Sequence, residues 1–231
     1  MPSPSPNSTL WAHYQTEQLE VFAGSRARLR FLIQRAERLT HSRSLLNIGC
    51  GDGYLEQTAQ KRNWKVVSVD PDAKSAERLR ALGLDARCGT IQALPLQEQS
   101  VDVVICTEVF EHLTPQVLEA GLNEIRRVLK PDGLLIGTVP YRENLAENEV
   151  FCPECKKRFH RWGHEQSFDE AGITSVIGRH LQVHEARPVY LPAWQAADWK
   201  GKLSLFARRA FSWIGVHSSE SNLLFVAART S

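Results

Sequence analysis

The spacing of apolar residues changes near residue 44. Residues 10–40 carry apolar positions at helical spacing, among them Leu29, Leu32, Ile33 and Ala36, with Arg and Glu between them. Beyond them, short runs with β-branched residues at 45–48, 66–69, 101–105 and 134–139 alternate with helix-like segments at about 53–62, 73–82 and 114–129. This alternation predicts an α/β fold in which helices cover both faces of a parallel sheet. Right-handed crossovers then place a ligand crevice at the carboxyl ends of the strands.

Length and composition fit one globular domain. A chain of 231 residues can bury one substantial core, and a net charge of +2 is too small to indicate nucleic acid. No apolar run reaches the roughly 18 to 20 residues of a membrane-spanning helix. Residues 1–9, rich in Pro and Ser, are expected to be a disordered leader without an export signal. An odd count of five cysteines, three of them in or beside strand-like runs, favours reduced thiols and a cytoplasmic protein.

A glycine-rich turn follows the first predicted strand. Residues 49–53 read Gly-Cys-Gly-Asp-Gly, and a helix is expected to start near Tyr54. The next strand ends at Asp70, where a carboxylate can accept hydrogen bonds from two ribose hydroxyls. Tyr54 stands where a dinucleotide fingerprint has its third glycine, and the chain has no P-loop motif. The pattern indicates a nucleoside-containing ligand and argues against a nicotinamide cofactor.

Six segments occur in a recognisable order, at 45–53, 67–70, 94–96, 101–104, 108–113 and 127–133. In this the chain resembles the class I S-adenosylmethionine-dependent methyltransferases, and their small-molecule and lipid-type branch in particular. The resemblance implies a Rossmann-like, doubly wound, mostly parallel seven-stranded sheet with an antiparallel last strand at 223–228. It divides the chain into an N-terminal helical cap at 10–43 and a methyltransferase domain at 44–231.

The same resemblance implies where S-adenosylmethionine binds. The glycines face the methionine part of the cofactor, Asp70 holds the ribose, the segment around Thr90 flanks the adenine, and Glu108 lies near the amino-acid end. The family commonly has Asp where Thr90 stands, so this contact departs from the pattern. The residues assigned to the cofactor are Gly49, Cys50, Gly51, Gly53, Asp70, Pro71, Thr90, Ile91 and Glu108.

His112 is the candidate general base. It follows Glu111 just after the fourth predicted strand, near the expected mouth of the crevice. A hydroxyl acceptor benefits from a base that takes its proton during methyl transfer. The alternative is that His112 caps or packs against a helix.

An insertion at 141–166 carries the spacing C-x2-C-x4-H-x3-H, formed by Cys152, Cys155, His160 and His164. Two thiolates and two imidazoles this close in sequence can coordinate one ion in tetrahedral geometry, so the motif predicts a structural zinc knuckle. The alternative is two free thiols and two histidines with separate duties, one of which is catalytic.

Residues 195–216 form a basic amphipathic pattern. Two tryptophans and other apolar residues within 199–214 recur at helical steps, while Lys and Arg lie mostly elsewhere on the wheel. Such a helix either packs on the domain or lies on an anionic membrane surface, which would place the protein peripherally at the inner face of the membrane.

The sequence therefore predicts methyl transfer to a small-molecule or lipid-linked acceptor, more often on oxygen than on nitrogen or carbon. Three alternatives stay open: a non-catalytic cofactor-binding module, a nicotinamide-dependent oxidoreductase, and an RNA-directed methyltransferase. RNA ranks low, because the basic cluster around Lys156 is short and belongs to the metal loop.

Overall fold

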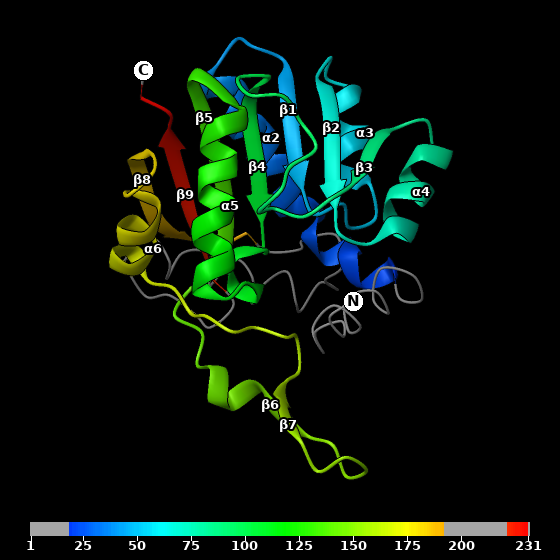
Figure 1. The fold of residues 1–231 in the computed structure, drawn as a ribbon, viewed down its shortest axis with the longest axis vertical. Coiled ribbons are helices and arrows are strands. Elements are labelled where there is room, and N and C mark those ends of the chain that lie inside the picture. Colours follow the sequence, from blue (N-terminus) through cyan, green and yellow to red (C-terminus); the bar gives the residue numbers. More distant parts are fainter. Residues whose placement is uncertain (1–18, 192–220, 231) are drawn as a thin grey trace, which may run out of the picture.

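A computed structural model describes residues 19–191 and 221–230. Within these residues, seven strands form one sheet in the order β3-β2-β1-β4-β5-β9-β8 (Figure 1). The strands of this sheet are β1 (Ser44–Ile48), β2 (Lys65–Asp70), β3 (Asp85–Cys88), β4 (Val101–Thr107), β5 (Leu129–Pro140), β8 (Gln182–Val189) and β9 (Asn222–Ala228). Strands β1 to β5 pair in parallel, and β9 runs antiparallel to both β5 and β8. The predicted mostly parallel sheet with an antiparallel last strand is confirmed.

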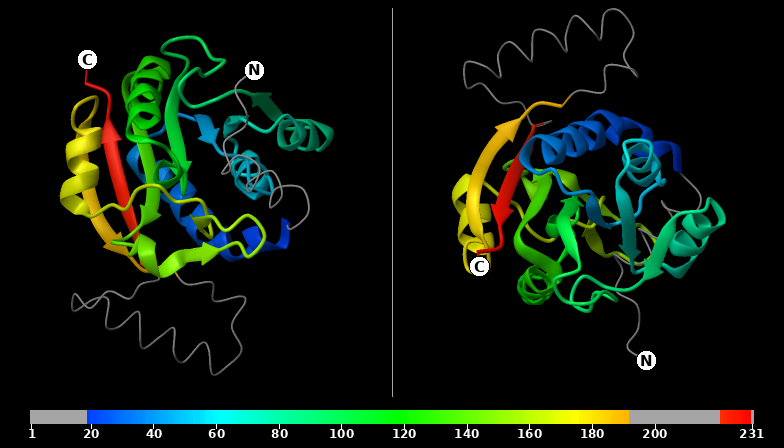
Figure 2. Two further views of the ribbon diagram at one scale, coloured as in Figure 1. Left: turned by 60° about the horizontal axis from the view of Figure 1, so that its bottom comes forward. Right: turned by 90° about the horizontal axis from the view of Figure 1, so that it is seen from above.

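Helices cover both faces of the sheet, as the view from above shows (Figure 2). One core cluster joins α2 (Arg26–Leu39) and α3 (Tyr54–Gln60) to one face, and another joins α5 (Pro115–Val128) and α6 (Glu170–Ile177) to the other. Helix α4 (Ala73–Ala81) packs beside β3. The apolar stripe predicted for the first helix is confirmed, since Leu29, Leu32, Ile33 and Ala36 are all buried in α2. Ahead of α2 the chain forms a 3-10 helix, η1 (Leu19–Ser25).

Short caps fix where the main helices begin. The Asp72 carboxylate accepts from the Ser75 N–H at the start of α4, and the Thr114 hydroxyl accepts from the Val117 N–H at the start of α5. These side chains satisfy backbone donors that a helix leaves without partners in its first turn. Pro115 at the first turn of α5 adds a fixed φ where its missing N–H costs nothing.

The insertion extends below the carboxyl edge of the sheet (Figure 1). It contains η3 (Leu145–Asn148) and an antiparallel hairpin of β6 (Glu149–Phe151) and β7 (Arg158–His160). Another 3-10 helix, η2 (Phe110–His112), follows β4. The insertion and η2 therefore lie at the edge where the parallel strands end.

Three predicted features lie outside the described residues: the leader at 1–9, the first part of the cap at 10–18, and all of the basic amphipathic segment at 195–216. None of the helices in the described part of the chain has the length and apolar character needed to span a bilayer.

Candidate active site

The glycine turn between β1 and α3 adopts a backbone that few other residues tolerate. Gly49, Gly51 and Gly53 have φ values of 89°, 49° and 82°, all in the left-handed region. A Cβ on Gly49 would lie 3.3 Å from the Val109 side chain, and one on Gly51 would lie 3.3 Å from Phe22. The turn thus contacts η1 on one side and the segment after β4 on the other.

Asp70 anchors this turn. Its side chain is 1% exposed at the end of β2, where Oδ2 accepts from the Cys50 N–H at 2.9 Å and Oδ1 accepts from the Asp72 N–H at 2.9 Å. Burial raises the pKa of the Cys50 thiol, and Asp70 adds to that shift. The carboxylate predicted to hold a ribose therefore also fixes the backbone of the glycine turn.

The segment predicted to flank the adenine lies beside Asp70. The Gly89 N–H donates to the Asp70 carbonyl at 3.0 Å. Ile91 is buried, and its side chain lies where a Cβ on Gly121 of α5 would be only 2.8 Å away, so it is part of the core. Thr90 is half-buried and Pro71 is exposed. The structure brings the predicted cofactor residues together at the carboxyl ends of β1, β2 and β3, and their contacts to a cofactor stay predictions.

Glu108 occupies a strained and well-supported position after β4. Its φ is 53°, which is uncommon for a residue with a side chain. Its Oε1 accepts from the Thr138 hydroxyl at 2.9 Å and from the Asn222 amide at 3.1 Å, and its Oε2 lies 3.8 Å from an Arg28 nitrogen. The sequence alone does not identify Arg28 as a site residue, because its position in α2 has no feature that distinguishes it from the other arginines of that helix.

Arg28 supplies a test of whether these residues fit S-adenosylmethionine. Its Nε is buried without a hydrogen-bond partner among the described residues. A guanidinium beside Glu108 suits the carboxylate of a methionine moiety, because Arg binds carboxylates with paired N–H donors. The turn, the carboxylate at the end of β2 and this unsatisfied donor fit the three parts of the cofactor.

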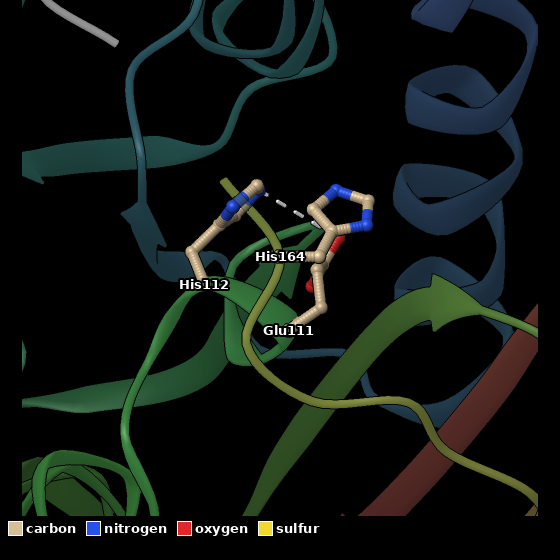
Figure 3. Close-up of side chains that lie close together, drawn as sticks. All are labelled: Glu111, His112 and His164. Carbon is tan, nitrogen blue, oxygen red and sulfur yellow. Dashed lines mark ion pairs between the residues drawn. The ribbon is translucent and has the colours of Figure 1, made fainter. Parts of the chain in front are cut away.

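A cluster of histidines and glutamates lies at the same edge of the sheet (Figure 3). Within the described residues, ligand atoms of Glu111, His112 and His164 lie within 4.8 Å of one another, and so do those of Glu143, His160 and His164. The His164 ring centroid is 4.6 Å from that of His112 and 4.6 Å from that of His160. His160 and His164 are therefore the residues through which the insertion contacts His112 and the rest of the site.

Four hydrogen bonds tie the end of the insertion to η2. The His112 Nδ1 lies 3.2 Å from the Gly163 carbonyl, and the Glu165 and Gln166 N–H groups donate to the Glu111 carbonyl at 2.7 and 3.1 Å. The Gln166 amide also donates to the Leu113 carbonyl at 2.7 Å. Residues some fifty positions apart in the chain therefore meet in a fixed arrangement.

His112 has properties that differ from those of a simple general base. Because its Nδ1 faces a carbonyl oxygen, that nitrogen carries the proton and the lone pair is on Nε2. Burial, reinforced by the neighbouring His164, lowers the pKa of His112 to about 3. A neutral imidazole with so low a pKa accepts protons poorly at neutral pH.

The structure does not bring the four predicted zinc ligands together. Cys152 and Cys155 lie in the turn between β6 and β7, with the Cys155 backbone nitrogen 3.5 Å from the Cys152 sulfur. His160, in β7, stacks on His164, whose ring packs against His112 of η2. The reason is the hairpin register, which pairs Glu149 with His160 and Phe151 with Arg158 and so sends the sulfurs to the far tip. Among the described residues, only the histidines of the C-x2-C-x4-H-x3-H motif join a cluster of possible ligands, and they do so with glutamates; the zinc knuckle itself stays a prediction.

Comparison with known proteins agrees with this fold. Residues 46–137 match the family described as a methyltransferase domain. A probable S-adenosylmethionine-dependent methyltransferase of Mycolicibacterium smegmatis is 35% identical over 111 residues, which is 46% of this chain and 42% of that protein. A ubiquinone biosynthesis O-methyltransferase of a Bradyrhizobium species is 38% identical over 98 residues, 40% of this chain and 38% of that protein. The chain thus spans about two fifths of the length of these curated relatives.

Among solved structures, a 1,6-didemethyltoxoflavin-N1-methyltransferase of Burkholderia thailandensis superposes with a TM-score of 0.67 at 14% identity. The match covers 97% of this chain and 87% of that one. The chain has the Rossmann-like α/β fold of class I methyltransferases. Residues 46–137, which contain the glycine turn, Asp70 and Glu108, form the part that matches the methyltransferase domain family.

Proposed function

We propose that this chain transfers a methyl group from S-adenosylmethionine to an oxygen atom of a small-molecule or lipid-linked acceptor. The observation that carries the proposal is the meeting of the left-handed glycine turn with the segment after β4, where Gly49 abuts Val109 beside Glu108. A cofactor lying along the turn has its amino-acid end at Arg28 and Glu108. The cluster of histidines and glutamates at the same edge of the sheet would then line the acceptor side.

The chain's own residues have distinct tasks in this proposal. Asp70 fixes the turn and accepts from the ribose, while Arg28 pairs with the cofactor carboxylate. When bound, S-adenosylmethionine supplies a methyl group on a sulfonium, so attack by the acceptor oxygen breaks the carbon–sulfur bond and leaves the electron pair on sulfur. Holding the acceptor in line with that bond supplies much of the rate acceleration. The insertion, hydrogen-bonded to η2, forms the wall on the acceptor side.

Oxygen is favoured as the accepting atom by the polar character of that wall. Glu111, His112 and His164 gather there, and a hydroxyl nucleophile needs to lose its proton as it reacts. The ubiquinone biosynthesis O-methyltransferases among the relatives are in keeping with this choice. Their shared segment is limited to the cofactor half of the fold, so the acceptor itself is inferred from the site.

The test incubates the full chain with methyl-labelled S-adenosylmethionine and cell extract separated into lipid, small-molecule, protein and nucleic-acid fractions. The proposal expects label in the lipid or small-molecule fraction, bound through an ether oxygen, together with release of S-adenosylhomocysteine. Label only in RNA would replace the acceptor class. Cofactor binding without label in any fraction would favour the non-catalytic module.

A further inference from the structure

Glu111 is a buried carboxylate, a group that normally has hydrogen-bond donors around it. Its side chain is 1% exposed, yet among the described residues neither carboxylate oxygen has a hydrogen-bond partner. A buried acceptor with two unsatisfied oxygens indicates a cationic ligand that the described part of the chain does not provide.

His112 and His164 each have a ring nitrogen within 4.8 Å of a Glu111 carboxylate oxygen. His112 has its Nδ1 on the Gly163 carbonyl, which places the lone pair on Nε2, and this Nε2 lies 3.9 Å from the Glu111 Oε1. His164 has its Nδ1 on the Glu143 carboxylate, in a very short contact. That carboxylate fixes the proton on Nδ1 of His164 and leaves the lone pair on Nε2.

Glu143 is a support for this arrangement, because its own acceptor sites are already used. Its Oε1 accepts from the Asn148 amide at 2.8 Å and lies 3.3 Å from the His160 Nε2, and its Oε2 faces His164. The Nδ1 of His160 is also engaged, since it accepts from the Trp162 and His164 N–H groups at 3.3 and 3.1 Å. Of the two clusters, Glu111, His112 and His164 form the one whose carboxylate oxygens have no hydrogen-bond partner among the described residues.

We propose that Glu111, His112 and His164 bind a divalent first-row transition ion through one carboxylate and two Nε2 atoms. Two imidazoles with a carboxylate suit such ions, and three protein ligands leave positions open for other molecules. A carbonyl or carboxylate on the second nitrogen of each ligating histidine is the usual support in metal sites, and Gly163 and Glu143 provide it here. Donors bound to one ion lie roughly 3 to 3.5 Å apart, so the 3.9 Å between His112 and Glu111 closes by less than about 1 Å on binding.

Resting on the proposed function, the site also defines an acceptor class: compounds with a hydroxyl that can ligate the ion. An ion lowers the pKa of a bound hydroxyl, so the acceptor proton passes to water and the resulting oxygen attacks the methyl group. Two of the proposed ion ligands, Glu111 and His112, come directly after Val109 and Phe110 in the chain, and Val109 contacts the glycine turn at Gly49. A ligated oxygen is therefore held on the side of the site where the methyl group is expected.

The test uses cobalt(II) as a spectroscopic probe, added to chelator-treated full-length protein without S-adenosylmethionine. The proposal predicts one equivalent bound, with ligand-field absorption, a raised thermal unfolding midpoint and no thiolate charge-transfer band. Glu111→Gln and His164→Gln should both lose this binding. Glu143→Gln should retain it with roughly 10- to 100-fold weaker affinity, because that residue acts only by orienting His164.

Two matched variants complete the design. His180→Gln removes a histidine that pairs with Glu119 and Asn123 elsewhere in the fold, and Cys152→Ser with Cys155→Ser removes both sulfurs of the hairpin tip. Both should bind cobalt like the wild type. Absence of binding to the wild type, or binding that survives Glu111→Gln and disappears with the sulfurs, would overturn the proposal.

Failure of the metal site and failure of the methyltransferase function are separable. Cofactor binding is measured on the same samples: Glu111→Gln should keep it, and an Asp70 variant should lose it while still binding cobalt. A wild type that binds cofactor but no cobalt would refute only the metal site. A wild type that binds cobalt but no cofactor would refute only the proposed function.

Discussion

Replacing Asp70 by Asn tests the idea that one buried carboxylate holds the cofactor turn. Asp70 accepts two backbone N–H groups at 2.9 Å, one from Cys50 in the turn and one from Asp72. Asn keeps the shape but offers one oxygen and one NH2 group, so one of the two donors meets another donor. Losing a hydrogen bond to a charged acceptor and leaving its donor buried costs about 2 to 4 kcal/mol.

The assay is urea unfolding of wild type and Asp70→Asn, followed by titration with S-adenosylhomocysteine. With a urea dependence of about 2 kcal/mol per molar, the midpoint should fall by roughly 1 to 2 M. Affinity for S-adenosylhomocysteine should fall about tenfold or more, because the turn is no longer fixed. The matched control is Asp85→Asn, whose side chain is 54% exposed in a surface pair with Arg87 and should matter by less than about 0.5 kcal/mol. An Asp70→Asn protein as stable as that control would refute the reasoning.

Three further predictions follow from buried groups elsewhere. Burial raises the pKa of Glu56, so the contribution of this group to stability is complete below its unfolded pKa of about 4.3 and is lost as pH rises through the folded pKa. The free energy of unfolding of the wild type should therefore fall relative to that of Glu56→Gln between pH 4.5 and 8. A difference that stays constant over this range would contradict the prediction. Gly137→Ala should lower the free energy of unfolding by about 3 kcal/mol or more, because the added Cβ would lie 1.9 Å from a backbone oxygen of β4. Gly24→Ala, whose Cβ would have nothing within 4 Å, should be near neutral in the same denaturation experiment. Arg28→Gln should weaken the binding of S-adenosylhomocysteine about tenfold but leave the binding of 5′-methylthioadenosine, which lacks the carboxylate, unchanged. Arg30→Gln on the same helix is the control. Equal losses of affinity for both ligands in Arg28→Gln would exclude a carboxylate contact.

The sheet and its main helices could be predicted because their signals are local. The buried runs of β1, β2, β4 and β5 are nearly continuous, as expected of strands covered on both faces, and α2 and α5 carry clear apolar stripes. The strands β3 and β8 were missed for the opposite reason. β3 has four residues of which one is buried, and β8 lies at the sheet edge with alternating exposed positions, so neither has an apolar run.

Only the site residues that have a local sequence signal could be predicted in the same way. The glycine turn and Asp70 lie at the ends of predicted strands, so topology alone places them at one edge of the sheet. The cluster of Glu111 with His164 depends on contacts between segments about fifty residues apart, for which the sequence has no local signal. Spacing suggested that Cys152 and Cys155 join His160 and His164, but hairpin register decides where the sulfurs point, and register is a property of the folded pairing.

The most direct test of the account is a competitive titration of the full chain with S-adenosylmethionine and NAD under identical conditions. The account predicts one saturable site for S-adenosylmethionine, displaced by S-adenosylhomocysteine and weakened by Asp70→Asn, with no binding of NAD at the same concentrations. Saturable binding of NAD without binding of S-adenosylmethionine would contradict it and make the glycine turn part of an oxidoreductase.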